Sequence, residues 1–343
     1  MSIPAQGSVN DWLRVSYSSL NLFSSCPRKF EFNKLYPRRA RDYDTFAADV
    51  GKCLHAGYQA YLMTRSEHDA FWAMAQVYPY EAEWNQDNDF RSFETATVVL
   101  EEMISSAQMI EYRVAQIKRP LTPEELIANG KAIAAGQDFL YDPTGIVVPA
   151  IEVPFELRLD GIILPDGRGV AVTGFVDAFL INVATERFRT MDIKTHRRYA
   201  RDATAKYKYD EQQVPYGIVL EHIQTKPVTE FEVLYLDCFV DLAEPRVELY
   251  TYDKTRESIQ EWLVDTVLRV QNLQTFMEMD YFPRRGTNCM AWNKPCFFLD
   301  ICAIRDRKQI EAWLLEGEAA EHRVEENPWV VAHLDVYGQK EAA

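Results

Sequence analysis

The sequence has no apolar run near the roughly 20 residues that a membrane-spanning helix needs, so we expect no membrane partner. Its first residues, MSIPAQGSVNDW, lack the basic start and apolar stretch of a secretory signal, which makes the cytoplasm the expected location. There is no G-x-x-x-x-G-K-[ST] phosphate loop, and we see no internal repeat or low-complexity linker. A composition of 47% hydrophobic and 26% charged residues is typical of a globular protein.

Excess positive charge is also absent, because the net charge is −15. This is unfavourable for a nucleic-acid partner, since phosphate binding needs Lys and Arg. The basic residues are nevertheless clustered in two stretches. One is KTHRRYARDATAKYK at 194–208, and the other runs from Arg28 to Arg41. Each could follow a phosphate backbone or could be an ordinary solvated face, and the sequence leaves both interpretations open.

Six cysteines occur, and in a cytosolic protein of this size they suggest a metal site, because a disulfide framework is not expected there. Cys53 and Cys238 lie in apolar patterns and are expected in the core. Cys289-x6-Cys296-x5-Cys302 lies in a polar loop, and Cys26 precedes a proline near the start. Four thiolates suit a [4Fe–4S] cluster or a Cys₄ zinc site, and the wide spacing favours the cluster over a zinc knuckle. The alternative is a set of scattered buried cysteines.

Hydrophobic periodicity predicts a helical block followed by a sheet. Helices are expected from Ser16, from Pro27 and near 47–63, 68–86, 91–118 and 122–138. Strands are expected over 146–159, 170–181 and 186–195, and again over 231–240 and 246–252, with helices at 211–222 and 255–279. A loop at 281–302, a helix at 309–318 and a weakly structured acidic tail complete the chain.

Two acids close apolar strands on neighbouring segments, Asp177 in GFVD and Asp192 in DIK. A hairpin would bring them together around a hard cation such as Mg²⁺ or Mn²⁺. Lys194 shares a strand face with Asp192 because side chains alternate, and it could orient the attacking water. A D-x-K triplet is weak evidence alone, and 306–308 matches without a preceding strand. The alternative is a pair of structural acids at strand ends.

Three further residues could complete such a site. His55 lies on an early helix in GKCLH, where it could ligate the metal or be an ordinary core histidine. Gln212 and Tyr216 are four residues apart on an expected helix and would share one face. Gln212 could hydrogen-bond the lysine or a base edge, and Tyr216 could stack or contact phosphate.

These motifs together resemble the RecB-like branch of the PD-(D/E)xK nuclease superfamily. SYSSLNLFSSCPRKFEF resembles the opening of RecB-like nucleases, and the motifs at His55, Asp177, Asp192 to Lys194, Gln212 to Tyr216 and the cysteine triplet follow in the same order. The layout, over residues 16–302, is similar to the iron–sulfur nuclease domain of AddB, to CRISPR-associated RecB-like exonucleases and to stand-alone phage versions.

The resemblance implies a role for each motif residue. His55, Asp177, Asp192 and the Ile193 carbonyl would hold Mg²⁺ or Mn²⁺, with Lys194 as the catalytic lysine. Gln212 and Tyr216 would support the catalytic lysine and the DNA. The ligands of the [4Fe–4S] cluster would be Cys26, Cys289, Cys296 and Cys302. The relatives usually have two residues between the first two cysteines of the triplet, where this chain has six. An acid before GFVD would be Glu152 or Glu156.

The implied fold is an α/β nuclease core, with a mixed central sheet flanked by helices, a helical insertion and a C-terminal segment clipped by the cluster. We expect N-terminal helices over 1–46, a helical block over 47–143, the core over 144–280 and a cysteine-rich segment over 281–343. The expected activity is hydrolysis of DNA, as an exonuclease on single-stranded ends, in recombination, repair or phage replication. A bacterial, archaeal or phage-infected cell and a helicase or recombination partner are implied. The alternative is a non-catalytic DNA-binding or scaffolding protein.

Overall fold

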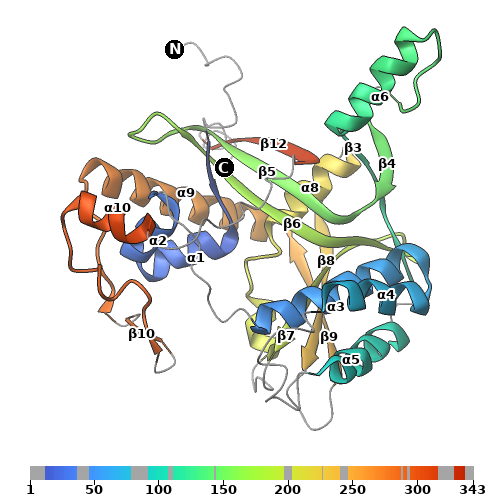
Figure 1. Ribbon diagram of the computed structural model, residues 1–343, viewed down its shortest axis with the longest axis horizontal. Coiled ribbons are helices and arrows are strands. Elements are labelled where there is room, and N and C mark those ends of the chain that lie inside the picture. The colour runs from blue at the N-terminus through green and yellow to red at the C-terminus, as the bar shows by residue number, and fades with distance from the viewer. Residues whose placement is uncertain are drawn as a thin grey trace.

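The computed structural model, shown in Figure 1, describes most of the chain. The described residues are 12–36, 46–78, 92–106, 111–142, 144–196, 203–225, 227–239, 246–286, 289–291, 294–315 and 328–336.

A mixed eight-stranded sheet forms the centre, with the order β12-β5-β6-β7-β8-β9 and with β1 and β2 both paired to β6. The pairs β7–β8, β12–β5 and β1–β6 are parallel, and the other pairs are antiparallel. Its strands are β1 (Trp12–Val15), β2 (Tyr112–Val114), β5 (Ile151–Ile163), β6 (Gly169–Asn182), β7 (Phe188–His196), β8 (Glu230–Phe239), β9 (Arg246–Thr255) and β12 (Val330–Asp335). Two small ladders pair β3 (Gln116–Arg119) with β4 (Ile146–Pro149) and β10 (Met290–Ala291) with β11 (Lys294–Pro295).

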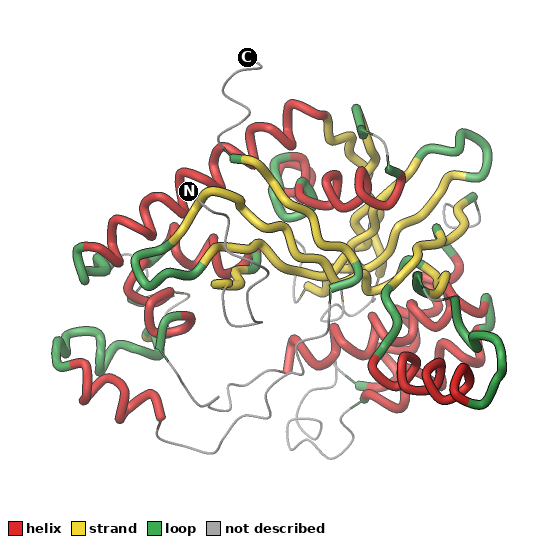
Figure 2. The backbone as a smooth tube through the Cα atoms, turned by 90° about the horizontal axis from the view of Figure 1, so that it is seen from above, coloured by secondary structure: helices red, strands yellow, loops and turns green. Residues whose placement is uncertain are grey.

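Helices cover both faces of this sheet, as Figure 2 shows. The helices of the described residues are α1 (Tyr17–Ser25), α2 (Pro27–Lys34), α3 (Phe46–Thr64), α4 (Glu67–Val77), α5 (Phe93–Ser105), α6 (Pro123–Ala134), α7 (Ala203–Lys208), α8 (Pro215–Gln224), α9 (Arg256–Glu278) and α10 (Arg307–Leu315). Within the described residues, no helix has the length and apolar character needed to cross a membrane.

The sheet divides the hydrophobic interior into two layers, and successive side chains of β8 point into one layer and then the other. Val233 and Tyr235 belong to the core built with α1, α8 and α9, whereas Leu234 and Leu236 pack against α3, α4 and α5. A strand buried on both faces needs this nearly continuous apolar sequence. The expected α/β architecture, a mixed central sheet flanked by helices, is therefore confirmed.

Local sequence signals begin several helices where they were expected. The Ser16 hydroxyl caps α1 by accepting the Ser19 N–H, and Pro27 occupies the first turn of α2. A capping box between Thr122 and Glu125 starts α6, which projects from the body together with β3 and β4 in Figure 1.

A third, smaller core joins α2 to the cysteine-rich segment. Phe32 packs there with Phe298, Ile301 and Ile310. The guanidinium of Arg28 donates to the Ile304 carbonyl, which adds a polar tie between the two segments. The N-terminal helices and the C-terminal segment are thus held together by packing, independently of any bound group.

Several expected elements differ from the structure. The helix predicted over 91–118 ends at Ser105, and β2 and β3 follow inside the range expected to be helical, because Tyr112–Val114 can pair with β6. Strands were also missed before the first helix (β1), in the acidic tail (β12) and in the expected loop (β10 and β11). All four are short, and β1 and β12 gain their stability from pairing with distant strands.

The proposed domain boundaries remain a prediction, although β1, β2 and β12 join the sheet from outside 144–280. Residues 79–86 of one expected helix, and 316–327 and 337–343 of the tail, lie outside the described residues.

Gly217→Ala should destabilise the fold by about 1–3 kcal/mol, because α8 packs tightly against β8 and α9. An added Cβ would lie 2.6 Å from both Phe231 and Ile259. Urea unfolding followed by circular dichroism measures the change.

Gly130→Ala provides the matched control, since a Cβ at this helical position meets nothing within 4 Å. It should stabilise the protein by about 0.5–1 kcal/mol through helix propensity. Equal effects of the two substitutions would contradict the packing described for α8.

Candidate functional site

Strands β6 and β7 separate at the position of the two expected acids. They pair from Ile181 with Phe188 to Ala178 with Met191, and there the ladder stops. Beyond that point β7 pairs only with β8. The carboxylate of Asp177 accepts the backbone N–H of Ile193 at 2.9 Å, so a side chain takes over where the ladder ends. Both acids lie inside their strands, each one residue beyond the last ladder pair, so the expectation that they end strands was wrong.

Three potential metal ligands meet beside this divergence, and they come from three elements. One ligand atom each of His55 (α3), Glu152 (β5) and Asp177 (β6) lies within 4.8 Å of the others. His55 Nδ1 is 3.7 Å from Asp177 Oδ2 and 3.8 Å from Glu152 Oε1. Its Nε2 is 3.1 Å from the Ile193 carbonyl oxygen, which fixes the ring against β7. An imidazole and two carboxylates form a donor set that fits Mn²⁺ or Mg²⁺.

Glu152 has a backbone conformation that few non-glycine residues adopt. Its φ is +47° in the middle of a paired region. The register of β5 with β6 is continuous on both sides, with Ile151 opposite Ala178 and Val153 opposite Val176, which places Glu152 across from Asp177. Such outliers persist where the surrounding structure enforces them, and they cluster at functional sites.

Glu156, the other candidate acid, is not part of this group. Its side chain is 1% exposed and bonds to the guanidinium groups of Arg14 and Arg158, each at 2.7 Å. Burial disfavours its charge, but these hydrogen bonds outweigh burial and lower the pKa of Glu156. Of the two acids left open by the sequence, the geometry favours Glu152 as a ligand and gives Glu156 a structural role.

Asp192 lies on the other side of β7, because its neighbours Met191 and Ile193 pack toward α3. Its Oδ2 is 2.7 Å from Lys194 Nζ, and its Oδ1 accepts from the Gln212 amide at 3.3 Å. Lys194 in turn donates to Gln212 Oε1 at 2.9 Å. Asp192, Lys194 and Gln212 therefore form a closed triangle beside the three clustered ligands, and Asp192 is not within that cluster of three.

The charges of the two groups perturb one another. Burial and the neighbouring Asp192 raise the pKa of Asp177 to about 7. Burial would lower the pKa of His55, but Glu152 and Asp177 outweigh it and raise the pKa to about 9. Asp192 likewise outweighs the effect of burial on Lys194 and raises its pKa, so the ammonium form is retained. Concentrated negative charge of this kind favours a bound cation.

Gln212 and Tyr216 are positioned differently from the expectation. Helix α8 begins at Pro215, so Gln212 lies in the preceding turn and not on the helix. The Tyr216 ring is only 4% exposed, and its hydroxyl donates to the Phe175 carbonyl at 3.0 Å. A buried ring cannot stack on a base, so Tyr216 fixes the backbone of β6 next to Asp177.

Two supporting residues had no motif that would reveal them. Asp210 accepts the Gln212 N–H at 2.9 Å and the Tyr17 hydroxyl at 3.1 Å. It therefore links the turn that carries Gln212 to the first turn of α1. Lys254 donates to the Asp210 carbonyl from β9. These contacts are long-range in sequence, and only the fold brings them together.

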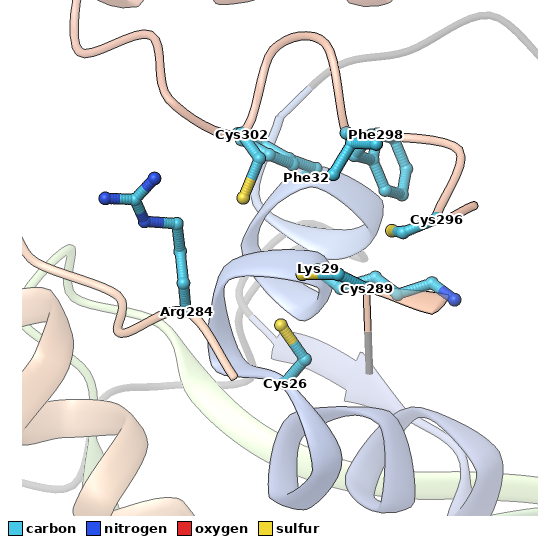
Figure 3. Close-up of a pocket in the computed structure, with 9 residues that line it drawn as sticks. Cys26, Lys29, Phe32, Arg284, Cys289, Cys296, Phe298 and Cys302 are labelled. Atoms are coloured by element: carbon cyan, nitrogen blue, oxygen red, sulfur yellow. The ribbon is translucent and has the colours of Figure 1, made fainter. Parts of the chain in front are cut away.

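The four cysteines expected to share a group surround one hollow, shown in Figure 3. Cys26 lies between α1 and α2, and Cys289, Cys296 and Cys302 come from the C-terminal segment. The Cys26 and Cys302 sulfurs point into the space between the two segments in Figure 3. Burial raises the pKa of the Cys302 thiol. Cys53 and Cys238 are buried in the α3–α5 core, as expected.

The six-residue spacing between Cys289 and Cys296 is accommodated by a small hairpin. Met290 pairs with Pro295 in the β10–β11 ladder. The Cys296 N–H then donates to the Cys289 carbonyl at 2.7 Å, so the two cysteines lie side by side at the open end of the hairpin. A longer insertion thus gives the same proximity as a short spacer.

The described cysteine sulfurs do not form the close group that a zinc site requires. Tetrahedral zinc with Zn–S bonds of about 2.3 Å places its sulfurs about 3.8 Å apart. Among the described residues, no three cysteine sulfurs lie within 4.8 Å of one another.

The basic stretches are only partly visible. Arg197, Arg198 and Arg201 of one stretch, and Arg38, Arg39 and Arg41 of the other, lie outside the described residues. Lys206 and Lys208 are exposed on α7.

Comparisons with known proteins support a family. A family model described as the PD-(D/E)XK nuclease superfamily matches residues 14–303. A crystal structure of a "Putative exonuclease" from Eubacterium rectale is similar, with 12% identity, a TM-score of 0.39, and coverage of 88% of this chain and 99% of that one. The crystal structure of SSO0001 gives 14% identity, a TM-score of 0.25, and coverage of 61% and 77%. No curated protein matches.

Asp177→Asn should stabilise the metal-free protein at pH 8 by about 1–3 kcal/mol. The folded pKa of about 7 lies above the unfolded value of about 3.9, so wild-type stability falls as the pH rises between these values. The gain of the variant should therefore grow from pH 5 to pH 8. Denaturant unfolding in EDTA at both pH values measures it.

Asp166→Asn is the control, because hydrogen bonds from Arg168 outweigh burial and lower the pKa of Asp166. That substitution should give no gain at pH 8. A variant at Asp177 that is less stable than wild type at pH 8 would contradict the charge crowding described above.

Proposed function

Because the chain belongs to the PD-(D/E)XK nuclease superfamily, we propose that it is a metal-dependent deoxyribonuclease that digests single-stranded DNA ends. The observation that carries this proposal is the meeting of His55, Glu152 and Asp177 beside the Asp192–Lys194 pair. The family consists of nucleases, so a nucleic acid is the substrate class. The preference for single-stranded ends, exonuclease action, and a role in recombination, repair or phage replication rest on the order of the sequence motifs.

The donor set supports a divalent ion. Two carboxylates and an imidazole meet in a site where burial and mutual repulsion penalise the uncompensated negative charge. When bound, such an ion supplies Lewis acidity and a more acidic water molecule. His55, Glu152 and Asp177 would hold it, with Asp192 and the Ile193 carbonyl as further proposed ligands.

Lys194 is the proposed catalytic lysine. Its ammonium group is held by Asp192 at 2.7 Å and by Gln212 at 2.9 Å, so its position is fixed without substrate. It stays protonated because the surrounding carboxylates raise its pKa. A fixed positive charge beside the phosphate can stabilise the negative charge that develops on phosphate oxygens.

A structural [4Fe–4S] cluster is the second part of the proposal, with Cys26, Cys289, Cys296 and Cys302 as ligands. The support is a hollow bounded by four thiols from both ends of the chain, with sulfurs too far apart for zinc. The group would add covalent ligation to the packing between α2 and the C-terminal segment. It would not take part in hydrolysis.

Lys194→Ala should reduce Mn²⁺-dependent digestion of labelled single-stranded DNA by at least about 10²-fold, because the developing charge loses its partner. Asp192→Ala should have a similar effect, since the lysine then loses its anchor. Initial rates with single- and double-stranded substrates measure both.

The second D-x-K triplet provides the matched control. Lys308 lies at the exposed start of α10, near Asp306, and Lys308→Ala should digest DNA at the wild-type rate. If wild type and both site variants are equally inert on several substrates, the alternative of a non-catalytic DNA-binding or scaffolding protein is supported.

Anaerobic purification should give brown protein containing about four iron atoms per chain, as a [4Fe–4S] formula requires. Cys26→Ser should lower the iron content and the unfolding temperature, because it removes the ligand from the N-terminal helices. Absorbance and metal analysis measure both.

Cys53→Ser is the control, because its thiol is buried in the α3–α5 core. It should keep its iron and its brown colour even if it is less stable. Colourless wild-type protein with stoichiometric zinc would overturn the cluster assignment.

A further inference from the structure

Two hollows beside the proposed catalytic centre share part of one wall. The larger has a volume of about 460 Å³ and lies along α1 and α2, bordered by Lys29, Asn33 and Lys34. The smaller has a volume of about 160 Å³ and is bordered by Gln212 and Tyr216. Ser16 and Ser18 line both, so the two hollows adjoin, and we call them together the groove. The smaller hollow reaches Gln212, which accepts a hydrogen bond from Lys194.

The wall of the larger hollow is basic, although the protein is acidic. The described residues that line it include two lysines and no carboxylate, whereas the whole chain has a net charge of −15. The Asn33 amide and the hydroxyls of Ser16 and Ser18 add uncharged donors. Lysines with neutral donors are the groups that bind a phosphate backbone in proteins.

The smaller hollow lies where the central sheet has a gap. β1 pairs with β6 only as far as Val172, and β7 joins β6 only from Ala178. In the described structure no strand pairs with the intervening residues of β6 on that side, and Thr173, Gly174 and Phe175 border the hollow there. In the described structure, five consecutive residues of β6, from Thr173 to Asp177, therefore lack a strand partner on that side.

Phe175 is an exposed aromatic residue beside the proposed site. It is 38% exposed, whereas Val172 and Val176 of the same strand are buried in the core. Phe175 lies two residues before Asp177 in β6, and two residues of strand span about 7 Å. A base stacked on Phe175 would therefore belong to a nucleotide next to the one at the metal ligands.

We propose that this groove binds single-stranded DNA and guides it to the catalytic centre. Lys29 and Lys34 contact phosphates, and Phe175 stacks on an unpaired base. The inference rests on the proposed nuclease function and adds the path of the substrate. The bases of a duplex are stacked and paired, so a duplex offers no free base face for Phe175, and a single strand should bind more tightly.

The experiment measures binding of a fluorescein-labelled oligothymidine to full-length protein by anisotropy, without divalent ions, over a range of salt concentrations. Lys29→Ala/Lys34→Ala should weaken binding and make the slope of log K against log salt less steep by about 1.4, because each neutralised phosphate of a single strand contributes about 0.7 to the slope. Phe175→Ala should weaken binding about 5- to 100-fold with an unchanged salt slope, because stacking is not ionic. Phe175→Tyr should retain wild-type affinity.

Lys118→Ala/Lys131→Ala is the matched control, because it removes the same charge from the projecting β3–α6 arm. It should leave the salt slope at the wild-type value. The groove proposal fails if the lysine double variant keeps the wild-type salt slope, or if Phe175→Ala and Phe175→Tyr bind oligothymidine equally well. It also fails if the groove variants lose as much affinity for a blunt duplex of the same length as for the single strand.

This binding assay is independent of cleavage. Wild-type protein that binds oligothymidine through these residues but cuts no DNA with Mn²⁺ would keep the groove and end the nuclease proposal. If wild-type protein cuts DNA but the groove variants bind oligothymidine normally, the nuclease proposal stands and the groove proposal fails.

Discussion

The separation of β6 from β7 is the constraint on which the rest of the site depends. If the antiparallel ladder continued past Ala178 and Met191, the Ile193 N–H would be used in the sheet and Asp177 would be one more strand residue. Because the ladder stops, the carboxylate of Asp177 takes that N–H, and the Ile193 carbonyl is left to meet His55. The point where the two strands separate therefore provides both backbone groups, from Ile193, and a carboxylate, from Asp177, to the same site.

Holding the strands apart requires support from both layers. On one side, α3 brings His55 to the opening, and the Glu152 backbone adopts a strained conformation opposite Asp177. On the other, the turn before α8 brings Gln212 to Asp192 and Lys194, and Tyr216 fixes the β6 backbone. The layers carry different chemistry, with ligand groups toward α3 and the fixed ammonium toward α8.

The cysteine hollow and the groove show how the ends of the chain serve this centre. The hollow joins Cys26 to the C-terminal segment, and α1 and α2 run from it toward the sheet. Lys29 borders both the cysteine hollow and the larger part of the groove. Tyr17, at the start of α1, reaches Asp210 and hence the turn of Gln212. The N-terminal helices therefore contribute residues to both hollows.

The sequence by itself determined the α/β class, the order of the motifs and the residues able to do the chemistry, because apolar periodicity and residue type are local properties. Asp177, Asp192 and Lys194 were identifiable since a buried strand makes a carboxylate unusual. The tertiary structure decided which residues meet. It favoured Glu152 over Glu156, because only a cross-strand register distinguishes two acids four residues apart. It placed Tyr216 in the core, and it added β1 and β12, whose short sequences are stabilised by partners distant along the chain. Contacts of this kind depend on packing between remote segments, which no local pattern encodes.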